Sequence, residues 1–196
     1  ILINLLGTGC AQIGMPTGGQ KDTIAPILIS ASPQLKTVNF SGNKITLTFN
    51  EYIEVKEAQT NILVSPFPKR NPEINYRLKT VTVKLKDSLQ PNTTYSINFG
   101  KAIVDVNEGN PLGNFTYIFS TGAAIDSLQL TGAVQIAETG KVDSTLLILL
   151  YRNATDSTVQ KTKPNYIAKP DGQGNFTFTN LPNDKFKMYA LKDADG

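Results

Sequence analysis

The fold is decided by a stretch in which apolar and polar side chains alternate, Lys44-Ile45-Thr46-Leu47-Thr48-Phe49-Asn50. Successive side chains of a β-strand point to opposite faces, so this period of two places Ile45, Leu47 and Phe49 together on one face. The opposite face carries lysine, threonine and asparagine. The stretch therefore predicts a β-strand with one face in a hydrophobic core and the other face in water.

The same alternation returns on both sides of this stretch. It predicts further strands at residues 27–30, 61–65, 74–78, 80–86, 95–99 and 115–119, whereas residues 54–60 allow at most one helical turn. Turn-forming residues separate these segments at Ser41-Gly42-Asn43, Pro66-Phe67-Pro68, Gln90-Pro91-Asn92 and Gly109-Asn110-Pro111. Short strands with a turn about every ten residues predict an antiparallel β-sandwich.

One connection between strands has a more specific sequence, Leu89-Gln90-Pro91-Asn92-Thr93-Thr94-Tyr95. It resembles the tyrosine corner of immunoglobulin-like and fibronectin-like sandwiches, in which the tyrosine hydroxyl bonds to the backbone a few residues upstream. A buried hydroxyl needs such a partner, which explains Tyr rather than Phe at this position. The resemblance implies a structural role for Leu89, Pro91 and Tyr95.

Residues 23–122 as a whole resemble the bacterial Ig-like domain of the S-layer-protein type. The matching residues are Asp22-Thr23-Ile24-Ala25-Pro26, Ser32-Pro33, Ile45-Thr46-Leu47-Thr48-Phe49-Asn50-Glu51, the stretch 89–95, Asp105-Val106-Asn107-Glu108-Gly109-Asn110 and Phe119-Ser120-Thr121-Gly122. The resemblance implies a spacer or adhesive module of a secreted or envelope protein. No set of catalytic residues comes with it.

A second β module is predicted for residues 126–196, after a short link at 122–125. Residues 127–134 alternate, and the apolar run 146–151 is too short to span a bilayer, which predicts a central strand buried on both faces. Residues 174–182 and 186–190 resemble the carboxypeptidase-regulatory-like, prealbumin-type β-sandwich, a structural module. That family normally continues past this point, so we expect the module to be incomplete. The predicted fold class is all-β, an Ig-like antiparallel β-sandwich followed by a second, truncated β-sandwich.

The N-terminal residues predict where the protein is located. An apolar run, residues 1–6, is followed by Gly7-Thr8-Gly9 and then by Cys10. Residues 1–9 resemble the end of a bacterial lipoprotein signal peptide, which implies that Cys10 is lipidated and becomes the first residue of the mature protein. Two features depart from the pattern, because Gly7 stands where Leu is usual and the chain begins without Met or a basic region, as a truncated fragment would. The alternative is a free Cys buried in an N-terminal strand.

Residues 10–22 follow the lipidation site and contain little to bury. Gly18-Gly19 disfavours regular structure, so the segment is predicted to be a flexible tether that reaches about 20 Å from the membrane.

The composition excludes several classes of function. The chain has no His and one Cys, which removes the commonest general base, internal disulfides and thiolate zinc sites. The formal net charge of +3 is too small, and arginine too rare, for a nucleic-acid groove. Ser and Thr lack a His or an evident Lys partner that would make them nucleophiles. We expect no catalytic residue, no metal, no cofactor and no nucleic-acid partner.

Two acidic groups allow more than one interpretation. Glu51, Glu54 and Glu57 follow a strand at intervals of three residues, and such carboxylates could hold Ca²⁺ or act as an acid and base pair. A solvated turn is the simpler interpretation. The loop 105–110 predicts a tight turn held by side-chain-to-backbone hydrogen bonds, with a Ca²⁺ site as the alternative.

Five of the ten Asp residues precede Ser or Thr and then Ile, Leu or Thr. This resembles the short acceptor sequence of a periplasmic O-glycosylation system of bacteria. It makes candidate glycosylation sites of Thr23, Ser88, Ser127, Ser144 and Ser157. The alternative is that Asp-Ser and Asp-Thr pairs favour turns and helix caps.

Together these features predict a non-enzymatic, lipid-anchored cell-envelope protein of the outer membrane, facing the periplasm or the exterior. It would act as a structural or protein-interaction module, accessory to an outer-membrane or surface complex, with exposed sheet edges as contact sites. One alternative is a carbohydrate-binding or adhesive module, which needs exposed aromatics on one face. The candidates are Tyr52, Phe67, Tyr76 and Tyr166. The other alternative is the non-catalytic N-terminal part of a larger enzyme.

Overall fold

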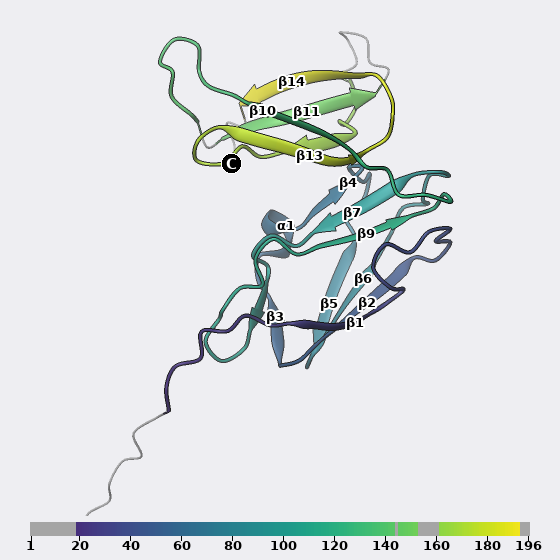
Figure 1. Ribbon diagram of the computed structural model, residues 1–196, viewed down its shortest axis with the longest axis vertical. Coiled ribbons are helices and arrows are strands. Elements are labelled where there is room, and N and C mark those ends of the chain that lie inside the picture. The colour runs from purple at the N-terminus through teal and green to yellow at the C-terminus, as the bar shows by residue number, and fades with distance from the viewer. Residues whose placement is uncertain (1–18, 144, 153–160, 193–196) are drawn as a thin grey trace, which may run out of the picture.

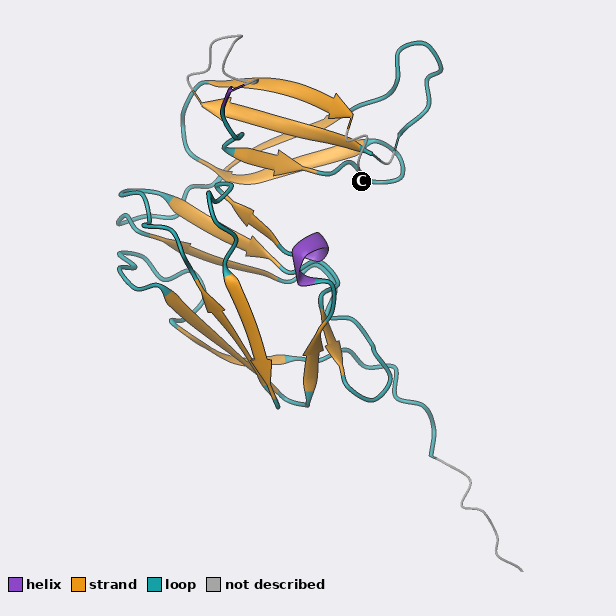
Figure 2. Ribbon diagram, turned by 180° about the vertical axis from the view of Figure 1, so that it is seen from behind, coloured by secondary structure: helices purple, strands orange, loops and turns teal. Residues whose placement is uncertain are grey.

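A computed structural model describes residues 19–143, 145–152 and 161–192, and these residues are mainly β-structure. Figures 1 and 2 show two β units stacked end to end, with a short helix, α1 (Ala58–Asn61), beside the first unit. The predicted all-β fold class is confirmed. Within the described residues, no helix combines the length and the apolar character that a membrane span requires.

The first unit contains nine strands between residues 28 and 120. They are β1 (Leu28–Ser32), β2 (Lys44–Phe49), β3 (Ile53–Val55), β4 (Leu63–Ser65), β5 (Glu73–Arg77), β6 (Thr80–Lys84), β7 (Thr94–Asn98), β8 (Ile103–Asp105) and β9 (Thr116–Ser120). All except β3 and β8 overlap segments predicted from the sequence. Those two strands have three residues each, and neither alternates between buried and exposed positions.

The strands of the first unit form two main antiparallel sheets. One has the order β1-β2-β6-β5 and the other the order β4-β7-β9, while β3 pairs with β8. After β1, residues 36–40 cross to the second sheet and run parallel to β9. There Lys36 N–H donates to Ile118 O (2.8 Å) and Phe40 N–H donates to Ser120 O (2.9 Å). The N-terminal part of the sandwich thus covers the outer edge of β9.

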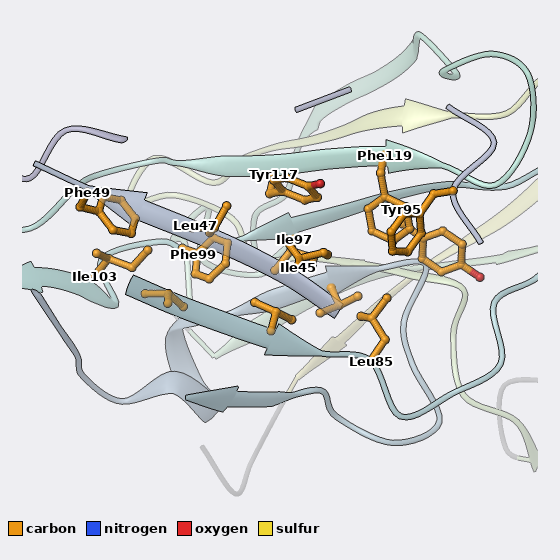
Figure 3. Close-up of a cluster of buried hydrophobic side chains, with 14 of the residues drawn as sticks. Ile45, Leu47, Phe49, Leu85, Tyr95, Ile97, Phe99, Ile103, Tyr117 and Phe119 are labelled. Carbon is orange, nitrogen blue, oxygen red and sulfur yellow. The ribbon is translucent and has the colours of Figure 1, made fainter. Parts of the chain in front are cut away.

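The hydrophobic core lies between these two sheets (Figure 3). Ile45, Leu47 and Phe49 are at most 1% exposed, which confirms the face predicted from alternation. Phe119 is fully buried, and its ring lies 4.7 Å from that of Phe40 and 5.2 Å from that of Tyr95, centroid to centroid. Aromatic packing therefore joins β9, β7 and the segment that runs beside β9.

The second unit is a smaller pair of sheets. Its strands are β10 (Leu128–Ala133), β11 (Leu146–Arg152), β12 (Tyr166–Ala168), β13 (Asn175–Leu181) and β14 (Phe186–Lys192). β10 pairs with β13, and β11 lies between β12 and β14. Four consecutive residues of β11, 148–151, are buried, as predicted for a central strand covered on both faces. The second core is formed by Ile148, Leu150, Tyr166, Ala168, Phe176, Phe178 and Leu181.

Hydrogen bonds join the two units. Asp126, directly after the link, donates its N–H to Thr94 Oγ1 (2.8 Å) and accepts from Asn180 Nδ2 through its carbonyl oxygen (2.9 Å). Phe67 N–H donates to Asn165 O (2.6 Å). The second unit is therefore seated on the end of the first sandwich where β7 begins and β4 ends.

Candidate functional site

The tyrosine predicted to form a corner lies at the junction of the two units. Tyr95 is 8% exposed, and its hydroxyl oxygen accepts a hydrogen bond from Gln90 N–H (2.8 Å). Burial raises the pKa of this phenol, the hydrogen bond from Gln90 opposes that change, and the carboxylate of Asp87 adds to it. Tyr95 is thus a neutral side chain that fixes the 90–95 turn, and this is the geometry of a tyrosine corner.

The residues around Tyr95 hold the same turn. Leu89 packs against the hydrophobic core, and Pro91 O accepts from Thr93 Oγ1 (2.8 Å). Thr121 Oγ1 donates to Gln90 O (2.6 Å) and accepts from Thr93 N–H (3.0 Å). Leu89, Pro91 and Tyr95 therefore have structural contacts, and none of these contacts activates a nucleophile.

A cleft of about 710 Å³ opens beside this corner, between the two units. The first unit lines it with the proline-rich turn 66–72 and with residues 85–90, and the second unit contributes residues 162–165. Lys163 Nζ lies 5.4 Å from the ring centroid of Phe67 and donates to Lys69 O (3.2 Å). The cleft is thus formed jointly by both sandwiches.

The charges that line the cleft are mostly positive. Among its described lining residues, the cations are Lys69, Arg70, Lys86 and Lys163, and the carboxylate is Asp87. Asp87 accepts from the N–H groups of Lys69 (2.7 Å) and Arg70 (3.0 Å) and from Arg70 Nε (3.0 Å). The hydrogen bonds from Arg70 and Lys69 hold the pKa of Asp87 below its usual range against the effect of burial. Arg70 is paired with Asp87 and Lys86 is paired with Glu73 (3.7 Å), so the surplus of positive charge in the cleft comes from Lys69 and Lys163.

The acidic residues that follow β2 do not form the group suggested by their spacing. Glu54 pairs with Lys56 (3.7 Å), whereas Glu51 faces carboxylates from distant segments. Burial raises the pKa of Glu51, and the carboxylates of Asp105, Asp22 and Glu108 raise it further.

The loop 105–110 has the hydrogen bonds that its sequence predicts. Asp105 is 2% exposed, and its carboxylate accepts from the N–H groups of Glu108 (2.7 Å), Gly109 (3.0 Å) and Asn110 (2.7 Å). Burial acts to raise the pKa of Asp105, but these hydrogen bonds outweigh it and lower the pKa. Asp105 therefore closes a turn. The described residues contain no group of three or more Asp, Glu, Cys or His side chains arranged to hold a metal ion.

The four aromatics suggested for sugar binding do not share one face. Tyr166 is 3% exposed and packs edge-on against Phe186, so its expected exposure is wrong. Phe67 lies at the junction of the two units, whereas Tyr52 precedes β3 at the far end of the first sandwich. Tyr76 is 46% exposed on the edge strand β5.

The candidate modification sites lie in different surroundings. Thr23, Ser88 and Ser127 are exposed. Cys10, Ser144 and Ser157 lie outside the described residues.

Comparisons with known proteins give a family for the first unit. The family model described as a bacterial Ig-like domain matches residues 22–121. The comparison with curated proteins finds no match.

The comparison with solved structures finds the N-terminal part of the bacterial S-layer protein SbsC, at 14% identity and a TM-score of 0.36, covering 87% of this chain and 45% of that one. The S-layer protein rSbsC(31-844) is similar at 17% identity and a TM-score of 0.36, covering 83% of this chain and 22% of that one. An L,D-transpeptidase from Mycobacterium smegmatis is similar at 9% identity and a TM-score of 0.33, covering 74% of this chain and 73% of that one. The chain thus spans less than half of either S-layer chain.

Proposed function

The chain belongs to the bacterial Ig-like domain family, and we propose that it is a non-enzymatic, lipid-anchored envelope protein that acts as a spacer and a protein-interaction module. In this proposal Cys10 carries the lipid, and the first sandwich separates the membrane from the second unit. The second unit is a carboxypeptidase-regulatory-like structural module. The protein is located at the outer membrane.

The observation that carries the proposal is the arrangement of the two units relative to the N-terminal segment. The first described residues leave the first sandwich at the end opposite the second unit (Figure 1). A lipid on Cys10 would therefore hold the second unit away from the bilayer, as a spacer requires. Several acyl chains, at about 0.8 kcal/mol for each buried CH₂, make such an anchor effectively permanent.

Three hydrogen-bonded carboxylates of the described residues support the non-enzymatic part of the proposal, whereas Glu51 is a carboxyl group whose pKa is raised. Asp87, Asp105 and Asp171 all have lowered pKa values, and each of them accepts hydrogen bonds from backbone N–H groups. A general base needs a raised pKa and access to a substrate proton. These three carboxylates close turns or hold loops instead.

We place the surface for a protein partner at the cleft between the units. Its proline-rich wall and Phe67 offer apolar contact, and its excess of cations favours an acidic, extended segment of another envelope protein. Replacing Lys163 with Glu should abolish a cross-link between this chain and its partner in intact cells, whereas replacing the exposed Lys101 should leave it unchanged. A cross-link that survives Lys163→Glu would place the partner elsewhere.

Metabolic labelling with palmitate tests the anchor. The wild-type protein should incorporate the label and enter the detergent phase on extraction, and Cys10→Ser should do neither. Circular dichroism spectra of the wild type and of Cys10→Ser, each compared with that of a folded β protein, control for loss of the fold. Label on the variant, or none on the wild type, would contradict the proposal.

We also propose O-glycosylation of the Asp-Ser and Asp-Thr sites. The exposure of Thr23, Ser88 and Ser127 supports it, because a transferase must reach the hydroxyl. The intact mass of protein from the native membrane should show a ladder of hexose additions that shortens in Ser127→Ala. An intact mass equal to that of the lipidated chain alone would exclude the modification.

A further inference from the structure

Exposed apolar side chains gather at the end of the first sandwich from which the N-terminal segment leaves. Ile24, Ile27, Tyr52, Leu78 and Val106 are each between 55% and 64% exposed. We refer to these five residues as the tether-end surface. Figure 1 shows the N-terminal segment leaving close to β3, on the side opposite the second unit.

Backbone hydrogen bonds hold the segments of this surface together. Val106 N–H donates to Tyr52 O (3.1 Å), and the residue after Tyr52 donates its N–H to Leu78 O (3.0 Å). The N-terminal segment joins the same turns, since Ile27 N–H donates to Asn50 Oδ1 (2.7 Å) and Ile27 O accepts from Asn50 N–H (3.0 Å). Tyr52, Leu78 and Val106 therefore lie on neighbouring segments, and the N-terminal segment that carries Ile27 is bound beside them.

The surface has the chemistry of a boundary between lipid and water. Large apolar residues at turn tips are unusual, because turns are normally polar, and several of them exposed on neighbouring turns indicate an interaction site. Lys79 Nζ lies 5.5 Å from the ring centroid of Tyr52 and donates to Asn50 O (2.6 Å). Tyr and Lys each combine an apolar body with a polar tip, so both suit the headgroup region of a bilayer.

The charge around the surface indicates which bilayer it would contact. Charges of both signs border the surface, because Asp105, Asp22 and Glu108 add to the effect of burial in raising the pKa of Glu51, whereas Lys79, which lies over the Tyr52 ring, lowers it. Binding to an anionic membrane requires a cluster of basic residues instead. The tether-end surface therefore suits a zwitterionic headgroup layer.

The chain between Cys10 and this surface is short. Nine Cα-to-Cα steps separate Cys10 from Gly19, a span of at most about 30 Å. A lipid on Cys10 would hold the surface near the bilayer at an effective concentration in the millimolar range. At that effective concentration even a small apolar surface contacts the bilayer for much of the time.

We propose that the tether-end surface docks on the lipid bilayer, with Tyr52, Leu78 and Val106 entering the headgroup region. This inference rests on the proposed lipid anchor at Cys10. Docking would orient the first sandwich so that the second unit points away from the membrane. A lipidated chain without docking would instead sample all orientations that its tether allows.

The composition of the chain allows a test that does not depend on lipidation in the cell. Cys10 is the sole cysteine, and the chain has no Trp. The full chain can be coupled through Cys10 to vesicles of brominated phosphatidylcholine that contain a small fraction of maleimide lipid. Tyr52→Trp then reports contact of this surface with the quenching acyl chains, and Met188→Trp, 53% exposed on the second unit, is the matched control.

Docking predicts strong bromolipid quenching of Tyr52→Trp and none of Met188→Trp. Adding Leu78→Glu to Tyr52→Trp should remove the quenching, whereas adding Leu128→Glu, which replaces an exposed leucine of the second unit, should not. Equal fluorescence in brominated and ordinary lipid would overturn the inference. A blue shift without quenching would also overturn it, since another copy of the chain would then cover the surface.

This result is separate from the test of the anchor. Quenching on coupled vesicles together with no palmitate label in cells would retain the docking surface and reject the lipid on Cys10. Label without quenching would retain the anchor and reject docking.

Discussion

Tyr95→Phe tests the physical basis of the junction, because it removes a single oxygen atom from the tyrosine corner. The ring should keep its stacking on Phe119, at 5.2 Å between centroids and 9° between planes. The N–H of Gln90 loses its acceptor at 2.8 Å. The net contribution of a hydrogen bond to stability is about 0.5–1.5 kcal/mol, and a buried donor left without any acceptor costs about 1–3 kcal/mol. This hydrogen bond is part-buried, so we expect a loss of about 1 kcal/mol.

Urea unfolding followed by circular dichroism measures this loss. With a slope of about 2–3 kcal/mol per molar urea, the midpoint should fall by about 0.3–0.5 M at an unchanged slope. Tyr76→Phe is the control, because Tyr76 is 46% exposed on an edge strand, and its midpoint should not move. Equal midpoints for the two variants would refute the assignment of Tyr95 as a tyrosine corner.

Three further variants test local features by the same unfolding assay. Glu51→Gln should raise the urea midpoint at pH 7, because the pKa of Glu51 is raised and its ionised carboxylate therefore destabilises the fold. Below about pH 4 the carboxyl is protonated and the substitution should have no effect. A lower midpoint at pH 7 would contradict the repulsion from Asp105. Asp87→Asn should lower the midpoint at pH 7, and the difference from wild type should shrink as the pH falls through the lowered pKa of Asp87. Gly174→Ala should have the lowest urea midpoint of the three variants, because the φ of Gly174 is +87° and a Cβ there would lie 2.4 Å from Val134 O. A midpoint equal to that of the wild type would exclude this clash.

Local periodicity was sufficient to predict the main strands and their buried faces. Ile45, Leu47 and Phe49 are almost fully buried because a strand's side chains alternate whatever the rest of the chain does. The apolar run of β11 predicted a covered central strand for the same reason. Turn chemistry also acts locally, as in the hydrogen bonds that Asp105 accepts within its own loop.

Contacts between distant segments were beyond the sequence pattern. Phe40 is 7% exposed because residues 36–40 pair with β9, about 80 residues further along the chain. Glu51 was grouped with Glu54 and Glu57 by a spacing of three, yet its neighbours in space are Asp105 and Glu108. In the extended backbone of β3, side chains alternate between two faces, so residues three apart point to opposite faces.

The junction between the units had no local signal either. Tyr166 was expected on the surface, but β12 pairs with β11 and the ring is covered by Phe186. In the sequence Asp87 is marked only as the residue before Ser88, although it holds the turn that contains Lys69 and Arg70. Both positions depend on packing between elements that are far apart in the chain.

The most direct measurement of the central claim is the mass of the N-terminal peptide of the protein isolated from native membranes. Digestion after Lys21 should release a peptide that begins at Cys10 and carries a diacylglycerol thioether and an amide-linked acyl chain. Blocking the transfer of diacylglycerol to the thiol should leave Cys10 without the added mass. A peptide that contains Cys10 with a free thiol, in a protein that still sediments with membranes, would contradict the account.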